Sequence, residues 1–314
     1  MAWLTWRQHR LQLLTGLVGL VSLAIAALVT ELPLRSAYHR DALASCLPPS
    51  LRSGCDIIVR RFEDEFSAGV DATRALIALP ALVGLFVGAP LLARELELGT
   101  ARLAWTQGIT RRRWLSQKLL LLALATLAGG AALGTLTMWW RHPFDAFEGR
   151  MSASVFEVEG LVVPAYALFA LMLGVLAGLV LRRTVPAMTA TLVAFGVTRL
   201  LVGRFLRPRF MAPIHESATS FTSRPHPGWV LEDTLYDAAG RHVTTGREDL
   251  AIVHAQLAGI DPHSYLAALG WHRVISYQPA DRFWAFQAIE AGIFAALSLG
   301  AAALALWAVR RTPA

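Results

Sequence analysis

Residues 84–114 read GLFVGAPLLARELELGTARLAWTQGITRRRW and decide the fold. An apolar helix continues to Ala93, turns charged at 94–97 and breaks at Gly99. A second apolar helix begins behind three arginines, 111–113. This pattern predicts a chain that leaves a membrane, builds a short element at its surface and enters the membrane again. Because the element combines charge, apolar area and helix caps, we expect it to bind a partner.

The composition of the chain indicates a membrane protein. Of its 314 residues, 55% are hydrophobic and 16% are charged, and the mean hydropathy is +0.48. Soluble domains carry about a quarter charged residues. The formal net charge of +7 does not predict a nucleic-acid partner, because many arginines lie at the ends of apolar segments, where membrane topology explains them.

Six apolar segments have about the length of 20 residues that a membrane-spanning helix needs. They are Leu11–Thr30, Thr73–Ala93, Trp114–Trp139, Leu161–Leu181, Val185–Val202 and Phe283–Val309. The first could be a signal peptide, but it is longer than the apolar core of such peptides and lacks a clear cleavage site. We expect an uncleaved span.

The positions of Lys and Arg predict the orientation. The short loops that an internal N-terminus places in the cytoplasm are richer in these residues than the short outer loops. Six spans then return the C-terminus to the cytoplasm. Arg204, Arg207 and Arg209 conflict with the rule, because they follow the fifth span on the outer side.

The long outer loop, 204–282, is large enough for a small domain. Within it, 229–236 and 241–245 resemble two strands around a turn. Residues 247–258 have helical periodicity, and Asp261 could cap a helix that continues to Leu269.

We therefore expect an all-α polytopic membrane protein with six transmembrane helices. A small α+β extracytoplasmic domain should lie between the fifth and the sixth. The predicted parts are a five-span region, 1–203, with a cytoplasmic loop at 94–113; the outer domain, 204–282; and the sixth helix with its tail, 283–314.

The two cysteines, Cys46 and Cys55, fall in the first outer loop, where a disulfide is chemically permitted. Two free thiols are the alternative. No Cys/His spacing matches a metal motif, and no Gly-x-x-x-x-Gly-Lys-Ser/Thr occurs. We expect neither a metal site, nor a catalytic centre, nor a cofactor bound by the chain itself.

The loop at 94–113 carries the predicted docking site. Gly99 suits the end of one helix, and Thr100 and Thr110 suit the start of others. Cations in the first turn of the third span oppose the helix dipole, so topology, lipid or an acidic partner must favour them. Topology alone explains these arginines but not Glu95 and Glu97. The predicted docking residues are Arg94, Glu95, Glu97, Gly99, Thr100, Arg111, Arg112 and Arg113.

Ionisable residues within spans are costly and indicate function or pairing. Glu290 lies about 10 Å into the sixth span at 1.5 Å per residue. We hypothesise that it pairs with Arg199 or Arg74; the alternative is that it reaches the membrane boundary. The glycine pairs 84/88, 130/134 and 174/178 allow close helix contacts, and packing within one chain is favoured over dimerisation.

The motif Gly-Ala-Pro-Leu-Leu-Ala-Arg-Glu-Leu-Glu-Leu-Gly-Thr-Ala-Arg-Leu-Ala-Trp-Thr-Gln at 88–107 resembles bacterial permease subunits of type-2 ABC transporters. Residues 3–8, WLTWRQ, and 277–284, YQPADRFW, share the resemblance, which extends over nearly the whole chain. It implies an amphipathic helix at 3–10 along the inner membrane surface. It also implies that residues 94–113 are a coupling helix region that contacts a cytoplasmic ABC ATPase.

The resemblance further implies an exporter in the bacterial cytoplasmic (inner) membrane, where lipid surrounds the spans. ATP would be bound by the separate ATPase subunit, and a second permease subunit, identical or different, would complete the transporter. It does not supply the cargo. The alternative function is a membrane sensor or accessory protein whose outer domain binds a ligand or a protein.

Overall fold

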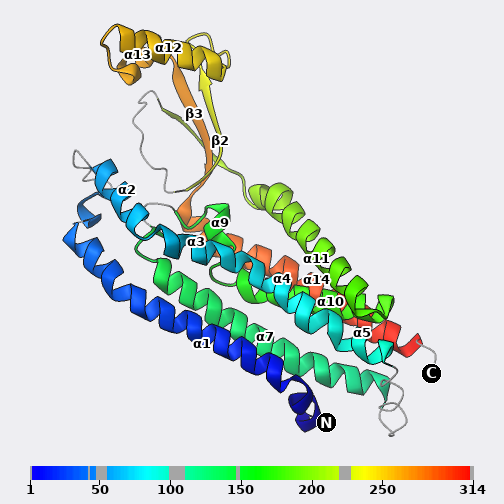
Figure 1. The fold of residues 1–314 in the computed structure, drawn as a ribbon. Coiled ribbons are helices and arrows are strands. Elements are labelled where there is room, and N and C mark those ends of the chain that lie inside the picture. Colours follow the sequence, from blue (N-terminus) through cyan, green and yellow to red (C-terminus); the bar gives the residue numbers. More distant parts are fainter. Residues whose placement is uncertain are drawn as a thin grey trace.

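The computed structural model describes residues 2–41, 43–46, 55–98, 110–145, 149–218 and 228–311. Six helical stretches in this part of the chain are long and apolar enough to cross a membrane (Figure 1). They run over Arg10–Arg40, Ser67–Glu97, Arg112–Arg141, Val162–Leu181, Thr184–Arg209 and Ala280–Arg310. The prediction of six spans is confirmed by these criteria, and several spans are longer than expected.

A small sheet with two helices lies in the chain between the fifth and the sixth span. The helices are α1 Ala2–Arg40, α2 Cys55–Glu65, α3 Ser67–Ala75, α4 Leu79–Val83, α5 Ala89–Glu97, α7 Arg111–Arg141, α9 Ala153–Phe156, α10 Val162–Leu181, α11 Thr184–Leu201, α12 Thr245–Leu257, α13 Pro262–Ala268 and α14 Phe283–Arg311. The strands are β1 Ile214–Ala218, β2 Trp229–Tyr236 and β3 His272–Gln278.

The second span changes helix type along its length. After α3 come a 3₁₀ turn, α4, a π-helical segment at Gly84–Gly88 and α5. Pro80 and Pro90 lie in the first turns of α4 and α5, where the missing N–H of proline is tolerated. The second span is therefore a series of short helical segments of different type.

Helix α10 is the centre of the bundle and packs against the second, third, fifth and sixth spans. Glycines make this packing close. A Cβ atom on Gly88 would lie 2.5 Å from the carbonyl oxygen of Leu171, and one on Gly174 would lie 2.5 Å from that of Gly84. Gly134 of α7 approaches the oxygen of Gly160 in the same way. These glycines thus allow close packing within one chain, which is the use that the sequence analysis favoured over dimerisation.

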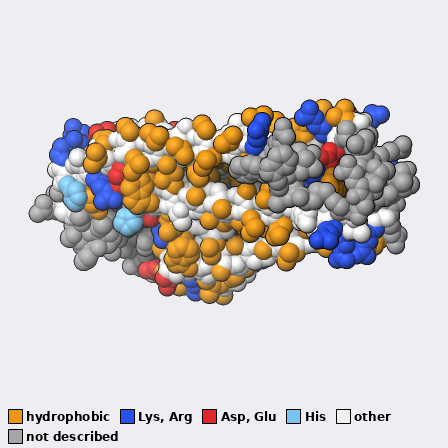
Figure 2. Space-filling view, turned by 90° about the horizontal axis from the view of Figure 1, so that it is seen from below, with side chains coloured by type: hydrophobic (Ala, Val, Ile, Leu, Met, Phe, Trp, Pro, Cys, Tyr) orange, Lys and Arg blue, Asp and Glu red, His pale blue; other side chains and the backbone are white. Residues whose placement is uncertain are grey.

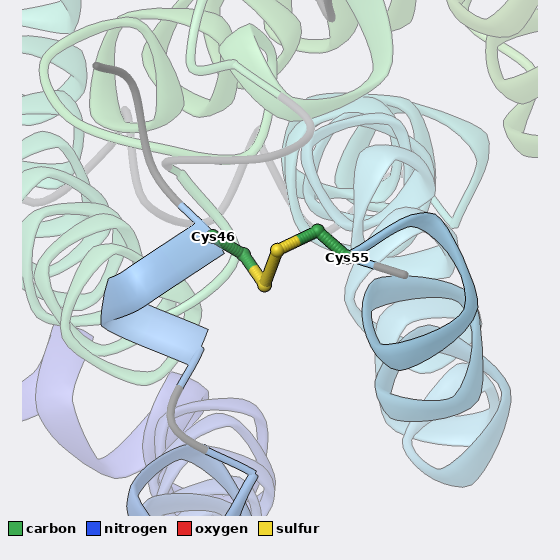
Figure 3. The surroundings of a disulfide bond; sticks show 2 residues. All are labelled: Cys46 and Cys55. Carbon is green, nitrogen blue, oxygen red and sulfur yellow. A yellow bond between two sulfur atoms is a disulfide. The ribbon is translucent and has the colours of Figure 1, made fainter. Parts of the chain in front are cut away.

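The first helix extends ten residues beyond the predicted end of its span, to Arg40. Its last turns are held by an apolar cluster that contains Leu34, Phe62 of α2 and Trp140 of α7. Beyond it, a 3₁₀ turn ends at Cys46, which forms a disulfide with Cys55 at the start of α2 (Figure 3). The bond therefore ties α1 to α2 across residues 47–54.

The segment between the fifth and sixth spans contains a three-stranded antiparallel sheet in the order β1-β3-β2. Helices α12 and α13 pack at one end of this sheet (Figure 1), where Leu235, Leu266 and Trp271 belong to one buried cluster. Both helices were expected, and the carboxylate of Asp261 accepts a hydrogen bond from the Ser264 amide at 2.9 Å. The predicted strand 241–245 is wrong: it is reduced to one bridge, Tyr236 to His242, because β2 pairs with β3 instead.

The sheet, α12 and α13 stand beyond one end of the helical bundle, and both termini lie at the opposite end (Figure 1). We call these the sheet end and the terminal end. Figure 2 shows hydrophobic side chains across the middle of one face, with charged side chains toward both ends. This distribution is the one that a bilayer requires of a multi-spanning protein.

Candidate functional site

At the terminal end, the two glutamates of α5 bind two different spans. The carboxylate of Glu95 accepts a hydrogen bond from the Lys118 ammonium of α7 at 2.6 Å. Lys118 is buried and lies 4.2 Å from the centre of the Trp114 ring. Glu95 therefore connects the second span to the third.

Glu97 makes the corresponding contact with the fifth span. One of its carboxylate oxygens accepts hydrogen bonds from the Thr184 amide, at 3.1 Å, and from the Thr184 hydroxyl, at 2.8 Å. Thr184 is the first residue of α11, so this carboxylate caps the helix from another span. The sequence offered no signal for this pairing across 87 positions.

Exposed arginines also lie at this end. Five of them, which we call the basic end surface, are Arg94, Arg112, Arg113, Arg182 and Arg183. Leu98 beside them is 65% exposed, and Thr110 caps α7 by accepting a hydrogen bond from the Arg113 amide. Among the other predicted docking residues, Gly99, Thr100 and the side chain of Arg111 lie outside the described residues.

The hypothesis that Glu290 pairs with Arg199 or Arg74 is wrong. Its carboxylate binds the guanidinium of Arg207, with Nε and Nη2 each 2.7 Å from an oxygen, and it also accepts a hydrogen bond from the Tyr166 hydroxyl. Both partners are almost completely buried, at 1% exposed. Such a bidentate ion pair is a strong and specific geometry for an arginine and a carboxylate.

Arg199 and Arg74 have other partners. Arg199 binds the carboxylate of Glu157 and donates a hydrogen bond to the Ile77 carbonyl at 2.8 Å. Arg74 forms an ion pair with Asp71 at 3.2 Å, one helical turn away. The Nη2 atom of Arg207 also lies 3.0 Å from the carboxylate of Glu157. Glu157 therefore binds both Arg199 and Arg207.

A π-helical segment explains why Arg207 was missed. The fifth span continues past its predicted end through a π-helix, Val202–Leu206, to Arg209. On a regular α-helix, the rotation about the helix axis from Arg199 to Arg207 would be about 800°, so their side chains would point about 80° apart. The π-helix accommodates one extra residue and reduces this rotation to about 700°. The two side chains then point in directions that differ by only about 20°. The one signal was the misplaced positive charge of Arg204, Arg207 and Arg209.

The resulting network contains Glu157, Tyr166, Arg199, Arg207 and Glu290. Two carboxylates balance two guanidinium groups, so the network is neutral when all four are charged. It connects the second, fourth, fifth and sixth spans near the sheet end. Its chemistry holds helices together, since every charge has a close partner of opposite sign.

Gln287 extends this arrangement to the start of α10. Its side-chain oxygen accepts a hydrogen bond from the Val162 amide at 3.0 Å, and its nitrogen donates to the Phe156 carbonyl at 2.9 Å. The residue is completely buried. It therefore satisfies backbone groups at a helix end that water cannot reach.

A second buried charge cluster lies between α7 and α10. The carboxylate of Glu159 is 3.5 Å from both Arg141 and Arg150, and Arg150 is 3.3 Å from Asp145. Burial, followed by the negative charge of Asp145, raises the pKa of Glu159 to about 7, against the opposing effect of the two arginines.

A pocket of about 440 Å³ opens at the sheet end between α2, α3 and α9. Carboxylates of Glu63, Asp64 and Asp71 and hydroxyls of three serines line it, with Arg74. No group of three possible metal ligands occurs within the part of the chain that the structure describes.

The fold and these contacts define a multi-pass membrane protein whose spans are fastened by glycine contacts and buried ion pairs. Residues 17–207, more than half of the chain, match the family described as ABC-2 membrane transporter related. The chain belongs to this family and is the membrane subunit of a transporter. No curated protein and no solved structure matches it.

The match covers the first five spans and the loop at 94–113. It ends at Arg207, before β1, so it does not extend to the outer domain or to α14. The family assignment therefore rests on the same segments that carry the Arg-Glu-Leu-Glu motif.

Proposed function

We propose that this chain is the permease subunit of an ABC exporter, driven by ATP that a separate ATPase subunit hydrolyses at the terminal end. The observation that carries the proposal is the family match over the first five spans, together with the exposed basic end surface. Membership of this family implies pairing with an ABC ATPase. Export rests on the resemblance of residues 88–107 to exporter permeases.

The basic end surface refines the predicted docking site. Glu95 and Glu97 were expected to face the partner, but their carboxylates bind Lys118 and Thr184. Apart from Glu97, whose carboxylate is already hydrogen-bonded, the exposed charges around Leu98 belong to the arginines of the basic end surface, so the ATPase should present acidic groups around an apolar contact with Leu98. Residues 99–109 belong to the proposed coupling element and lie outside the described residues.

The orientation of the chain is part of the proposal. The terminal end would face the cytoplasm, and the sheet end, with the disulfide, would face the outside. The disulfide supports this orientation, because such bonds persist in oxidising compartments. A second permease subunit, identical or different, and lipid would cover the exposed apolar faces of α1 and α11.

Sidedness can be measured by cysteine labelling in intact cells. Both native cysteines are in the disulfide, so an introduced cysteine is the only free thiol. A membrane-impermeant maleimide should label Leu257→Cys, which is 81% exposed in α12, without permeabilisation. It should label Leu98→Cys only after permeabilisation; the opposite pattern would overturn the orientation.

Docking can be measured by purifying the chain with its ATPase. Arg113→Glu should reduce the recovered ATPase at least about tenfold, because a reversed charge faces acidic groups. Arg241→Glu, in the sheet domain, is the matched control and should leave recovery unchanged. Equal recovery with both variants would exclude the basic end surface as the docking site.

A further inference from the structure

The Glu97 carboxylate supplies a cap that α11 does not provide for itself. Arg183 precedes the helix, and its side chain makes no capping hydrogen bond. The first amides of a helix need acceptors, and a negative charge there is favourable. Glu97 supplies both from the last residue of α5, while the Thr184 hydroxyl adds a second hydrogen bond.

Directly behind this contact, α5, α10 and α11 are packed at very short range. Ala89 and Ala93 of α5 form a buried cluster with Ala187 of α11. A Cβ atom on Gly178 of α10 would lie 2.5 Å from the Ala89 carbonyl oxygen. The buried side chains of this interface are alanines, with Met188 packed at its edge, and the helix backbones are in direct contact, so a displacement of one helix should displace its neighbours.

The far end of α11 is also fixed. Its continuation carries Arg199 and Arg207 into the buried network with Glu290 of α14. From Thr184 to Arg207 the helix spans roughly 35 Å at 1.5 Å per residue. The fifth span therefore joins the terminal end to the network near the sheet end.

We propose that Glu97 is a positioning residue that transmits movement of the coupling element to the fifth span. This inference rests on the proposed function, because the movement originates in the ATPase. When the partner displaces residues 94–98, the hydrogen bonds of Glu97 draw the first turn of α11 along. Glu95 makes the parallel connection to the third span through Lys118.

Glu95 is the matched control for Glu97. Both are acidic, both lie in the last turn of α5, and their hydrogen bonds reach different spans: Glu95 binds Lys118 of α7 and Glu97 binds Thr184 of α11. Removal of either carboxylate changes the charge equally. Only removal of Glu97 releases α11, so a general effect of charge or of a weakened coupling element would appear in both variants.

The test measures how α11 moves in the complex with the co-purified ATPase. Spin labels are placed at Val185→Cys in α11 and Leu304→Cys in α14, which are 71% and 55% exposed. Their separation is measured by pulsed electron spin resonance without nucleotide and after trapping with ATP and vanadate. The background variants are Glu97→Ala, Thr184→Val and Glu95→Ala.

In the labelled parent protein and in its Glu95→Ala variant, nucleotide trapping should shift the distance between the two spin labels. With Glu97→Ala the shift should fall to less than half, while the ATPase remains bound. Thr184→Val, which keeps the amide contact, should give an intermediate shift and tests the contact if Glu97→Ala does not fold.

An undiminished shift with Glu97→Ala or Thr184→Val would overturn the role of Glu97 and leave the proposed function intact. The absence of any shift in the labelled parent would also overturn it. If no ATPase co-purifies with the labelled parent, the proposed function and the inference both fail.

Discussion

Replacing Glu290 by leucine removes the carboxylate that balances the buried Arg207 guanidinium. The substitution removes the two 2.7 Å contacts and leaves the Tyr166 hydroxyl, at 3.3 Å, and Glu157, at 3.0 Å, which already binds Arg199. Because Arg207 is 1% exposed, it cannot recover these contacts from water. Breaking a buried pair in this way costs about 3–5 kcal/mol. At about 1.4 kcal/mol per tenfold, the unfolding constant should rise by about two to three and a half orders of magnitude.

The double variant Glu290→Leu/Arg207→Met distinguishes pairing from simple loss of packing. It leaves the Glu157–Arg199 pair neutral, so it should cost at least about 2 kcal/mol less than the sum of the single variants. The assay is unfolding in mixed detergent micelles, followed by the fluorescence of the ten tryptophans. A loss of stability in the double variant that equals the sum of the two single losses within about 0.5 kcal/mol would refute a direct interaction.

Three further predictions concern other parts of the fold. Gly88→Ala should destabilise the protein by about 1–3 kcal/mol in the same assay, because its Cβ meets the Leu171 carbonyl oxygen at 2.5 Å; an unchanged stability would contradict the close packing of the π-helical segment Gly84–Gly88 on α10. Glu159, whose pKa rises to about 7, binds its proton more tightly in the folded state, so its contribution to stability falls by roughly 3 kcal/mol as the pH rises from about 4.5 to 7. Glu159→Gln should remove this fall in stability between about pH 4.5 and 7, and a pH profile of stability identical to that of the parent would contradict the raised pKa of Glu159. Cys46→Ser, which opens a disulfide between residues nine positions apart, should cost about 2–3 kcal/mol, and the same loss should follow reduction of the parent protein; no loss in either case would argue that α1 and α2 are held by packing alone.

The sequence predicted the spans because each is an apolar run bounded by arginines, and it predicted α12 and α13 from periodicity and the Asp261 cap. It could not predict the true end of the fifth span. The register there depends on a π-helix, which has no reliable local pattern. The partner of Glu290 depends on that register, so the misassignment of Arg207 to the outer loop led directly to the wrong ion pair.

The contacts of Glu95 and Glu97 within the chain illustrate a different limit. Glu95 and Glu97 were assigned to a partner because nothing near them in the sequence required acidic side chains. Their contacts with Lys118 and Thr184 join separate spans, and such contacts are fixed only by the packing of the whole bundle. Similarly, β2 was paired with its neighbour in sequence, whereas the sheet places β3 between β1 and β2.

The central claim is that this transporter subunit works with a separate ATPase at its terminal end. The most direct measurement is purification of the C-terminally tagged chain from its native host in mild detergent, with mass spectrometry of the proteins that accompany it. The account predicts one P-loop ATPase in fixed stoichiometry, cross-linked through a photoreactive residue at Leu98. Recovery without an ATPase, even after this cross-linking, would contradict the account and favour a sensor or accessory protein.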